Sequence, residues 1–503
     1  EAARRRWHTQ HRYLLLAAAV LVLTASQTRN GQWSSDMWEH VAVVRELIAR
    51  PGHPEHPQLL LDAPHPGFSP YAVALGVVGR AFDLAPITVL SWAAIGNVAL
   101  LLVALRSLVR ATTDDDRAPF WALLFVLLLW GVGPFRYSGF FGLGSIGFVA
   151  PYPSTFATAV AFATLVAALR FARGGSVAWL AGVAAGAALV LLVHPLSAPW
   201  LAMALVVVGA LRVRPWARLA AFAAAGAAAV GLAVAWPYFS IVDLVRGSGE
   251  LEGLNRSMYA GVLPRTFPLL LGVVAIAHRW RSDRGDLLTA WLAGAALLYG
   301  LGAAVDNTSL GRTLAFIVVL LAVAVAASVS RVEGAGPLRA QPPPVRWAAA
   351  GLGGLLVLGA VTAASGAVRM VPDELLPGSV REAEELVRPD ERYAFLVGPV
   401  GPTDVVLASR KADDRVIPAL TGRTVVLAAP RPFIDDLAER DRAQRELLDV
   451  ETPPARRAEL LDRYEVRFVL LRTDRRDEPL REQLEAEGAT VEARVPGFVL
   501  LRR

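Results

Sequence analysis

Long apolar segments separated by short charged connections fill residues 13–367, and shorter apolar runs alternate with charged segments after about residue 370. A helix of roughly 20 apolar residues crosses the hydrocarbon core of a bilayer. The pattern therefore predicts a polytopic α-helical membrane protein with about eleven spans, followed by a different kind of domain. The predicted spans are 13–28, 88–107, 118–134, 154–171, 175–193, 196–211, 217–240, 264–278, 286–305, 311–329 and 347–367.

The run 70–86 is ambiguous because it contains Gly76, Arg80 and Asp83, so it is either a further span or a helix lying at the interface. Cytoplasmic connections carry an excess of Arg and Lys, and this rule separates the alternatives. With 70–86 left out of the count, all the Arg-bearing connections fall on one side. We therefore prefer a cytoplasmic N-terminus, a first span retained as a signal anchor, and an extracytoplasmic C-terminal domain. The Arg-bearing connections on this cytoplasmic side are 4–12, 106–117, 170–173, 212–218, 279–284 and 331–346.

After residue 370 the apolar runs become shorter than those of the predicted spans. Runs of aliphatic and β-branched residues alternate with charged segments at helical spacing, which predicts a mixed α/β domain. The domain has no Gly-rich phosphate loop and no cluster of metal ligands, so we expect a lid, an acceptor-binding or an assembly role. The predicted strands are 394–400, 405–408, 424–428, 466–472, 490–495 and 497–501, and the predicted helices are 380–386, 433–448, 454–464 and 479–487.

Charge divides the chain at the same place. Residues 1–370 carry 28 Lys+Arg and 17 Asp+Glu, a net charge of +11, whereas residues 371–503 carry 22 and 27, a net charge of −5. Since 54% of the chain is hydrophobic and 19% charged, the basic balance marks a membrane face and does not indicate nucleic acid. The absence of cysteine excludes a disulfide framework and thiol chemistry. We predict a transmembrane domain over 1–370, with a first outer loop at 29–87, and a soluble domain over 371–503.

The first outer loop is rich in ionisable side chains close to the membrane, where such groups are costly and tend to be functional. Apolar positions repeat at helical spacing and predict an amphipathic helix over 36–50, with a serine before it as the cap. Asp36, Glu39 and His40 lie three and four residues apart, so they project from one side. Carboxylates beside an imidazole suit a general base, and the simpler interpretation is an Asp at a helix N-terminus with solvated neighbours.

Four of the eight histidines lie in this loop, among several prolines. His53 and His56 are candidate ligands for a divalent metal such as Mg, Mn or Ca, since imidazole and carboxylate bind metals. Their spacing is irregular, and a proline-rich connection whose histidines face water is the alternative. The sequence indicates no other cofactor.

Three further outer features could bind a ligand. Arg136 and Tyr137 open a Gly- and aromatic-rich loop that ends near Tyr152, where an aromatic platform suits a sugar and an Arg suits a phosphate. An interfacial aromatic belt would have the same composition. His194 joins two predicted helices, either as a functional residue or as a hydrogen-bonded turn. Arg312 starts a predicted helix, and Arg at a helix N-terminus makes a phosphate receptor. A capped loop with an interfacial Arg is the alternative.

Taken together, these residues resemble the GT-C superfamily of membrane glycosyltransferases. The resemblance rests on the segment 36–40 (DMWEH) just after the first span, on 65–71 (HPGFSPY), on the Arg-bearing outer loop at 312 and on a soluble outer domain after the last span. It covers the whole chain as architecture. GT-C enzymes take a sugar from a lipid phosphate, and members with this layout are arabinosyl- or mannosyltransferases of cell-envelope glycans.

The resemblance implies roles for individual residues. Asp36 would deprotonate the acceptor hydroxyl, with Glu39 and His40 beside it, and the sugar, a pentose or a hexose, would transfer with inversion. The family often has paired acidic residues in this loop, whereas Asp36 is followed here by Met37, which leaves the use of a metal open. The donor phosphate or lipid would bind Arg312, Arg136 and His194, and the acceptor or sugar would bind Trp38, Tyr137, Tyr152 and His65.

Three other classes of function fit parts of this pattern. A polymerase or ligase of lipid-linked glycans would share the lipid donor, but its large outer element usually lies between spans. A transporter or flippase would have charges buried within its spans or repeated halves, which the sequence does not show. A non-catalytic assembly or receptor protein would have the tail as its working part. The expected partners are a polyprenyl-phosphate-linked sugar, a glycan or lipid-linked acceptor and membrane lipids, in the plasma membrane.

Overall fold

The computed structural model describes residues 2–31, 33, 36–133, 135–247, 255–379, 389–427 and 432–503. They group into two compact units, each built from segments that are distant in the sequence. The membrane unit comprises Glu1–Gly31, Ser91–Trp236 and Leu251–Glu384, and the loop–tail unit comprises Gln32–Leu90, Pro237–Glu250 and Glu385–Arg503. The predicted boundary at residue 370 divides the chain differently, because the first outer loop groups with the C-terminal tail.

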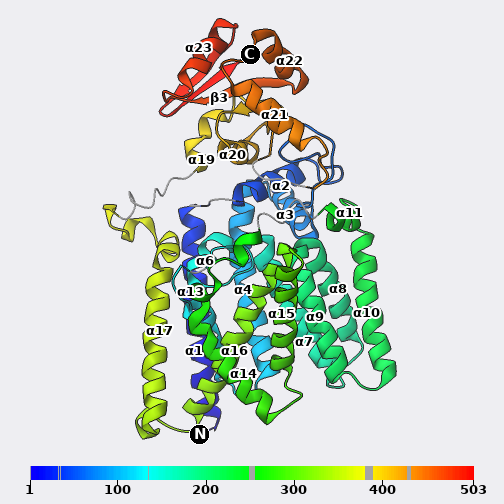
Figure 1. Cartoon of the computed structure of the whole chain (residues 1–503), viewed down its shortest axis with the longest axis vertical. Helices are drawn as coiled ribbons and strands as arrows, with labels where there is room; N and C mark the ends of the chain where they lie inside the picture. The colour runs from blue at the N-terminus through cyan, green and yellow to red at the C-terminus, as the bar shows by residue number, and fades with distance from the viewer. Residues whose placement is uncertain are drawn as a thin grey trace. The chain divides into compact units, whose positions relative to one another are not determined.

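The membrane unit is built of helices in the part that the structure describes (Figure 1). Its elements are α1 (Ala2–Asn30), α4 (Pro86–Thr112, which begins in the loop–tail unit), α5 (Ala118–Leu128), α6 (Leu143–Val149), α7 (Pro153–Ala172), α8 (Ala178–Val193), η1 (Pro195–Ser197), α9 (Ala198–Arg212), α10 (Trp216–Val234), η3 (Arg256–Met258), α13 (Val262–Thr266), η4 (Phe267–Leu270), α14 (Leu271–Ser282), α15 (Leu287–Ala304), η5 (Thr308–Arg312), α16 (Thr313–Gly334), η6 (Leu338–Ala340), α17 (Pro343–Ala367), η7 (Val368–Met370) and η8 (Asp373–Leu375).

All eleven predicted spans coincide with helices. Among the described residues, eight helical segments are long and apolar enough to cross a membrane, and they match eight of those spans. The predicted spans 118–134 and 175–193 fall on the shorter apolar helices α5 and α8, and 13–28 lies inside the 29-residue α1. The polytopic helical fold is thus confirmed, although length and composition alone single out fewer spans than predicted.

Helix α16 lies at the centre of the membrane unit. It packs against α5, α14 and α15, and most of its side chains are buried. The ring of Phe316 on α16 stacks on Trp200, with ring centroids 4.5 Å apart, and meets Trp291 at 6.1 Å. Helix α17 approaches α5 and α6 through glycines, since a Cβ on Gly359 would lie 1.6 Å from the Leu128 carbonyl oxygen. Small residues allow such close helix contacts in membranes.

The ambiguous run 70–86 forms α3 (Pro70–Ala81) in the loop–tail unit, followed by the start of α4. A helix of 12 residues is about 18 Å long, short of the roughly 30 Å of a bilayer core. It packs against α2 (Met37–Ala49) through Gly76, where a Cβ would lie 2.5 Å from that of Leu47. Excluding this run from the span count therefore agrees with the structure.

The tail forms a five-stranded mixed sheet of order β2-β1-β3-β5-β4. Strand β1 pairs in parallel with β2 and β3, whereas β5 pairs antiparallel with β3 and β4. The elements of the loop–tail unit not yet given are α11 (Ile241–Arg246), α19 (Pro389–Arg392), η9 (Ala394–Leu396), β1 (Val405–Ala408), α20 (Asp413–Leu420), β2 (Arg423–Thr424), α21 (Leu437–Leu448), α22 (Pro454–Arg463), β3 (Val466–Arg472), α23 (Glu478–Ala486), β4 (Thr490–Val495) and β5 (Phe498–Arg502).

Four of the six predicted strands recur within one residue, and three of the four predicted helices recur within four residues. The predicted strand 394–400 is wrong, because Ala394–Leu396 forms a 3₁₀ turn and Gly398 has a φ of +115°, which interrupts an extended run. The predicted strand 424–428 shrinks to the two residues of β2, and helix α20 was not predicted. The predicted helix 380–386 and the serines at 34 and 35 lie outside the described residues.

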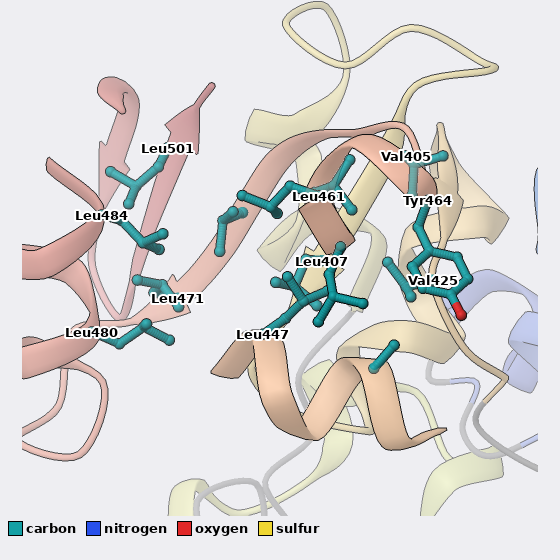
Figure 2. Packing of buried hydrophobic residues seen from close by; sticks show 14 of the residues in the cluster. Val405, Leu407, Val425, Leu447, Leu461, Tyr464, Leu471, Leu480, Leu484 and Leu501 are labelled. Carbon is teal, nitrogen blue, oxygen red and sulfur yellow. The ribbon is translucent and has the colours of Figure 1, made fainter. Parts of the chain in front are cut away.

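The core of the tail lies between the sheet and helices α21, α22 and α23 (Figure 2). Leu407 on β1 and Leu471 on β3 are buried among Leu447, Leu461 and Leu484, which the three helices contribute. Each fully buried side chain of this kind stabilises a fold by roughly 1.5–3 kcal/mol. This core fixes the register of the strands and carries α20, which follows β1.

Residues of the first outer loop extend this tail. The backbone N–H of Thr424 on β2 donates to the Gln58 carbonyl at 2.8 Å, and Leu59 forms an isolated bridge with Thr424. The Arg423 guanidinium donates to the Glu46 carboxylate at 2.6 Å, and both side chains are only 2% exposed. A buried ion pair therefore links α2 to β2 inside one unit.

Two buried histidines shape the loop between α2 and α3. His56 Nδ1 accepts the backbone N–H groups of Gln58 and Leu59, and His65 Nδ1 accepts that of Gly67. The two rings meet edge to face, with centroids 5.0 Å apart. Burial lowers the pKa of His65 to about 3 and that of His56 well below its usual value, so both imidazoles are neutral near pH 7.

We predict that breaking the Glu46–Arg423 pair destabilises the loop–tail unit. Glu46→Gln leaves Arg423 buried without a counter-charge, and the expected loss is about 3 kcal/mol in the free energy of unfolding. Denaturant unfolding of the purified protein, followed by a probe in the tail, measures this loss.

The matched control is Glu55→Gln in the same network, because the Glu55 side chain is 35% exposed where it pairs with Arg50. Its loss should stay below about 1 kcal/mol. Equal losses for the two variants would contradict a special role for the buried pair.

We also predict that stability falls with pH below about 6.5. The unfolded chain binds protons at its histidines near pH 6.5, whereas folded His65 stays neutral down to about pH 3, so acid favours unfolding. Each such histidine contributes a slope of roughly 1 kcal/mol per pH unit between these values. The His65→Asn variant keeps an acceptor for the Gly67 N–H and should lose one such slope in melting curves from pH 7 to 5. A slope that is the same in wild type and in His65→Asn would contradict this assignment.

Candidate active site

The first candidate residues lie at the start of α2. Asp36 precedes the helix with φ −66° and ψ −9°, and its side chain makes no capping hydrogen bond to the helix. Glu39 and His40 follow on the first turn. The Asp36 charge acts on the His40 imidazole, whose pKa burial nonetheless lowers to about 4. The structure therefore brings the predicted trio together, with His40 neutral near pH 7.

A cation from the tail completes this cluster. Arg415 on α20 places Nε 3.1 Å from Oε1 of Glu39 and Nη2 3.8 Å from Oδ1 of Asp36. Both helices belong to the loop–tail unit and pack along each other. The two carboxylates thus share one guanidinium.

Buried aspartates fix the helix that carries Arg415. The Asp413 carboxylate accepts hydrogen bonds from the Tyr393 hydroxyl and from Arg472, and that of Asp414 accepts one from Gln444 at 3.1 Å. Neither aspartate is exposed, and burial raises the pKa of both. The start of α20 is therefore anchored on the tail core, and Arg415 is held at α2.

The two carboxylates of the cluster differ in access. The Glu39 side chain is 5% exposed, whereas that of Asp36 is 49% exposed. A general base must reach the proton that it removes. Asp36 can meet an incoming hydroxyl, and Glu39 can act on one only through its neighbours.

The second group of candidate residues lies in the membrane unit. Arg312 ends η5 and precedes α16, where its Nε donates to the Asn255 amide oxygen at 2.8 Å and its Nη1 to the Ser138 carbonyl at 2.7 Å. A pocket is lined by Arg312 together with His194 and aromatic side chains such as Trp200. The guanidinium is thus oriented at the N-terminus of a 22-residue helix, beside a largely apolar cavity.

His194 connects the walls of this cavity. Its Nδ1 lies 2.8 Å from the Ser197 hydroxyl and its Nε2 3.3 Å from the Ser138 hydroxyl. The predicted grouping of Arg312 with His194 is therefore found in the structure, with Ser138 between them.

Other candidates lie apart from the cavity. Arg136 hydrogen-bonds Ser365 and covers the ring of Phe148. Tyr137 is 37% exposed, but three further candidate sugar-binding side chains are buried, with at most 6% of their surface exposed: Trp38, Tyr152 and His65. A sugar stacks on an exposed ring face, so in this conformation only Tyr137 among the four offers one.

The candidate metal ligands do not form a donor set. His53 is exposed, and His56 is buried with Nδ1 already accepting two backbone N–H groups. Among the described residues, no group of three or more His, Cys, Asp or Glu side chains could hold a metal ion. Neither the Asp36 cluster nor the Arg312 cavity therefore presents a ready metal site in that part of the chain.

Sequence reasoning missed Arg415, Asn255 and Ser197. The acidic pair Asp413-Asp414 before an apolar run is a helix-start signal and could have located α20. Nothing in the sequence, however, pairs Arg415 with carboxylates more than 370 residues earlier.

Comparison with known proteins finds similarity in structure but none in sequence. No family model matches the chain, and no curated protein matches it in sequence. The arabinofuranosyltransferase AftD from Mycobacteria is similar in structure, with a TM-score of 0.61 and 16% identity over 98% of this chain and 40% of that one. The chain thus spans about two fifths of the length of AftD.

Two further solved structures are similar. ArnT from Cupriavidus metallidurans, bound to undecaprenyl phosphate, has a TM-score of 0.54 and 14% identity over 97% of both chains. The archaeal oligosaccharyltransferase AglB from Archaeoglobus fulgidus, in complex with an inhibitory peptide and a dolichol-phosphate, has a TM-score of 0.50 and 13% identity over 91% of this chain and 69% of that one. At these identities the likeness shows the fold, and the chain has the polytopic membrane fold of the GT-C glycosyltransferases.

Proposed function

We propose that this chain is a membrane glycosyltransferase that moves a sugar from a polyprenyl-phosphate donor to an extracytoplasmic acceptor. The observation that carries the proposal is the Asp36 cluster: a half-exposed carboxylate beside a buried glutamate that an arginine compensates. The GT-C fold supports it, because the similar solved structures are glycosyltransferases and two of them hold a polyprenyl-type lipid phosphate.

Asp36 would act as the general base. As the acceptor hydroxyl attacks the anomeric carbon, its proton passes to the Asp36 carboxylate. The bond from that carbon to the phosphate oxygen breaks, and the lipid phosphate leaves with the bonding electron pair. The acceptor attacks the face opposite the leaving group in a single displacement, so the sugar transfers with inversion. The donor already carries its leaving group, so orientation, proton removal and stabilisation of the phosphate are the tasks left to the protein.

Glu39 and Arg415 would hold the base in place. Since Arg415 lies nearer to Glu39 than to Asp36, it compensates the buried charge first. Two adjacent carboxylates would otherwise repel each other and favour protonation of one. His40 is neutral near pH 7, so its imidazole can donate or accept a hydrogen bond without adding charge to the cluster.

Arg312 would bind the donor phosphate. Its two hydrogen bonds to Asn255 and Ser138 restrict the guanidinium, which lowers the ordering cost when a ligand binds. Arg forms charge-assisted bonds to phosphate, and the N-terminus of α16 adds favourable partial charge. The apolar side chains of the cavity suit the first part of a lipid chain.

The proposed acceptor is a cell-envelope glycan or glycoconjugate outside the plasma membrane. This assignment follows from the predicted orientation, with an extracytoplasmic tail. The sugar is a pentose or a hexose, as the resemblance implies.

We predict that Asp36→Asn lowers kcat about 100- to 10,000-fold, because the amide cannot accept the proton. A radiolabelled polyprenyl-phosphate sugar and a purified acceptor, assayed in detergent or nanodiscs, measure the transfer. The control is Asp62→Asn, which neutralises an exposed carboxylate of the same loop and should keep near-normal kcat. Normal transfer by a folded Asp36→Asn variant would exclude Asp36 as the base.

We predict that Arg312→Ala mainly impairs donor use, lowering kcat/KM for the donor about 10- to 100-fold, with a smaller change in the acceptor KM. Arg312→Lys keeps the charge and should recover part of the loss. Arg256→Gln removes an exposed arginine that pairs with Asp306 and serves as the control. Donor kinetics that are unchanged in Arg312→Ala would remove Arg312 from the donor site.

A further inference from the structure

The membrane unit holds a second cavity, at its arginine-rich end. It lies where α4, α7, α9 and α14 end and α15 begins. Charged side chains dominate its wall, from Arg173, Arg212 and Arg279 and from Asp114, Asp283 and Asp286. The proposed transfer reaction uses none of these residues.

Part of the charge in this wall is already satisfied. Arg279 and Asp286 form an ion pair with side chains 13% and 7% exposed, and Asp286 also accepts the backbone N–H of Thr289 at the start of α15. Asp283 accepts the backbone N–H of Gly285 at 2.8 Å. These contacts form the turn between α14 and α15. They do not involve Arg173, Arg212 or Asp114, which also line the cavity.

Arg173 and Arg212 are the groups with unused capacity. Each donates one hydrogen bond across the cavity wall, Arg173 to the Ala111 carbonyl at 2.6 Å and Arg212 to the Gly285 carbonyl at 3.0 Å. A guanidinium carries five N–H donors, so these contacts fix its position without exhausting it. In the part of the chain that the structure describes, neither forms an ion pair, whereas Arg110 and Arg117 nearby do.

The surroundings favour an anion. The four connections at this end, 106–117, 170–173, 212–218 and 279–286, carry eleven Arg and five Asp. Each helix C-terminus here is followed by the N-terminus of the next helix, so the helix dipoles largely offset one another. In the wall itself, Asp114 and Asp283 are the opposing carboxylates without a cation partner among the described residues.

Exposed tryptophans on the same connections favour a position of this cavity near the lipid headgroups. Trp216 and Trp280 belong to the same connections and are 83% and 47% exposed, and the Arg284 guanidinium lies 3.7 Å from the Trp280 ring centroid. Exposed tryptophans at helix ends mark the membrane–water interface. Basic pockets between transmembrane helices on the cytoplasmic side bind anionic headgroups.

We propose that this cavity binds the phosphate of an anionic phospholipid through Arg173 and Arg212. The apolar floor, from residues such as Leu169 and Leu287, then lies beneath the glycerol and the first methylenes. The phosphate accepts hydrogen bonds from both guanidinium groups and bridges α7 and α9. A soluble phosphate has the same headgroup chemistry but would gain nothing from that floor.

The test measures lipid binding to the purified full chain in detergent, by native mass spectrometry, for phosphatidylglycerol, phosphatidylcholine and inorganic phosphate. Wild type should retain phosphatidylglycerol in preference to phosphatidylcholine, and millimolar phosphate should not displace it. The double variant R173Q/R212Q should bind phosphatidylglycerol about 30-fold more weakly, from the loss of two interfacial arginines. Asp114→Asn should tighten binding about threefold.

The matched control is R331Q/R339Q, which removes two exposed arginines, one in the last turn of α16 and one in the segment between α16 and α17. It should change affinity less than threefold, because neither side chain lines the cavity and salt screens exposed charges. Melting curves without added lipid show whether each variant is folded, and R173K/R212K provides a conservative second variant. Equal retention of the two lipids, displacement by millimolar phosphate, or equal losses in the two double variants would each overturn the proposal.

Discussion

The buried Glu46–Arg423 ion pair is the interaction on which the candidate catalytic cluster depends. It joins α2 from the first outer loop to β2 from the tail, and both charged side chains are buried. Such a pair is weak evidence for net stability, but removing one partner is strongly unfavourable. Its effect is geometric: once β2 lies beside α2, the preceding helix α20 must run along it, and Arg415 reaches Glu39 and Asp36.

Contacts between the first outer loop and the tail also explain why these two segments group into one compact unit. The loop contributes a β-bridge at Leu59 and a small apolar cluster with Leu427 and Ile434, so the tail core is incomplete without it. A chain cut at residue 370 would separate α2 from its ion partners. The tail therefore contributes to the candidate active site through Arg415, in addition to any role as a lid or an acceptor-binding domain.

Local patterns predicted most of the fold. Long apolar runs located the spans, because a helix buried in lipid must be long and apolar. Short aliphatic and β-branched runs between charged segments located β1, β3, β4 and β5. Both kinds of run depend only on residues that are neighbours in the sequence. The grouping of Asp36 with Glu39 and His40 was predictable from one helical turn. The burial of Trp38 and Tyr152 was not predictable, since residue type alone does not tell a buried aromatic side chain from an exposed platform.

Arginine partners were the least predictable feature, because an ion pair is decided by the folded chain and not by spacing. In the loop–tail unit, Arg415, Arg423 and Arg472 each meet a buried carboxylate, so their charge is used to hold the unit together. At the arginine-rich end of the membrane unit, Arg279 is used in the same way, whereas Arg173 and Arg212 meet only carbonyl groups. A carbonyl orients a guanidinium but does not neutralise it. Among these arginines, the two bound to carbonyls are therefore the ones that can still bind an anion from outside the chain.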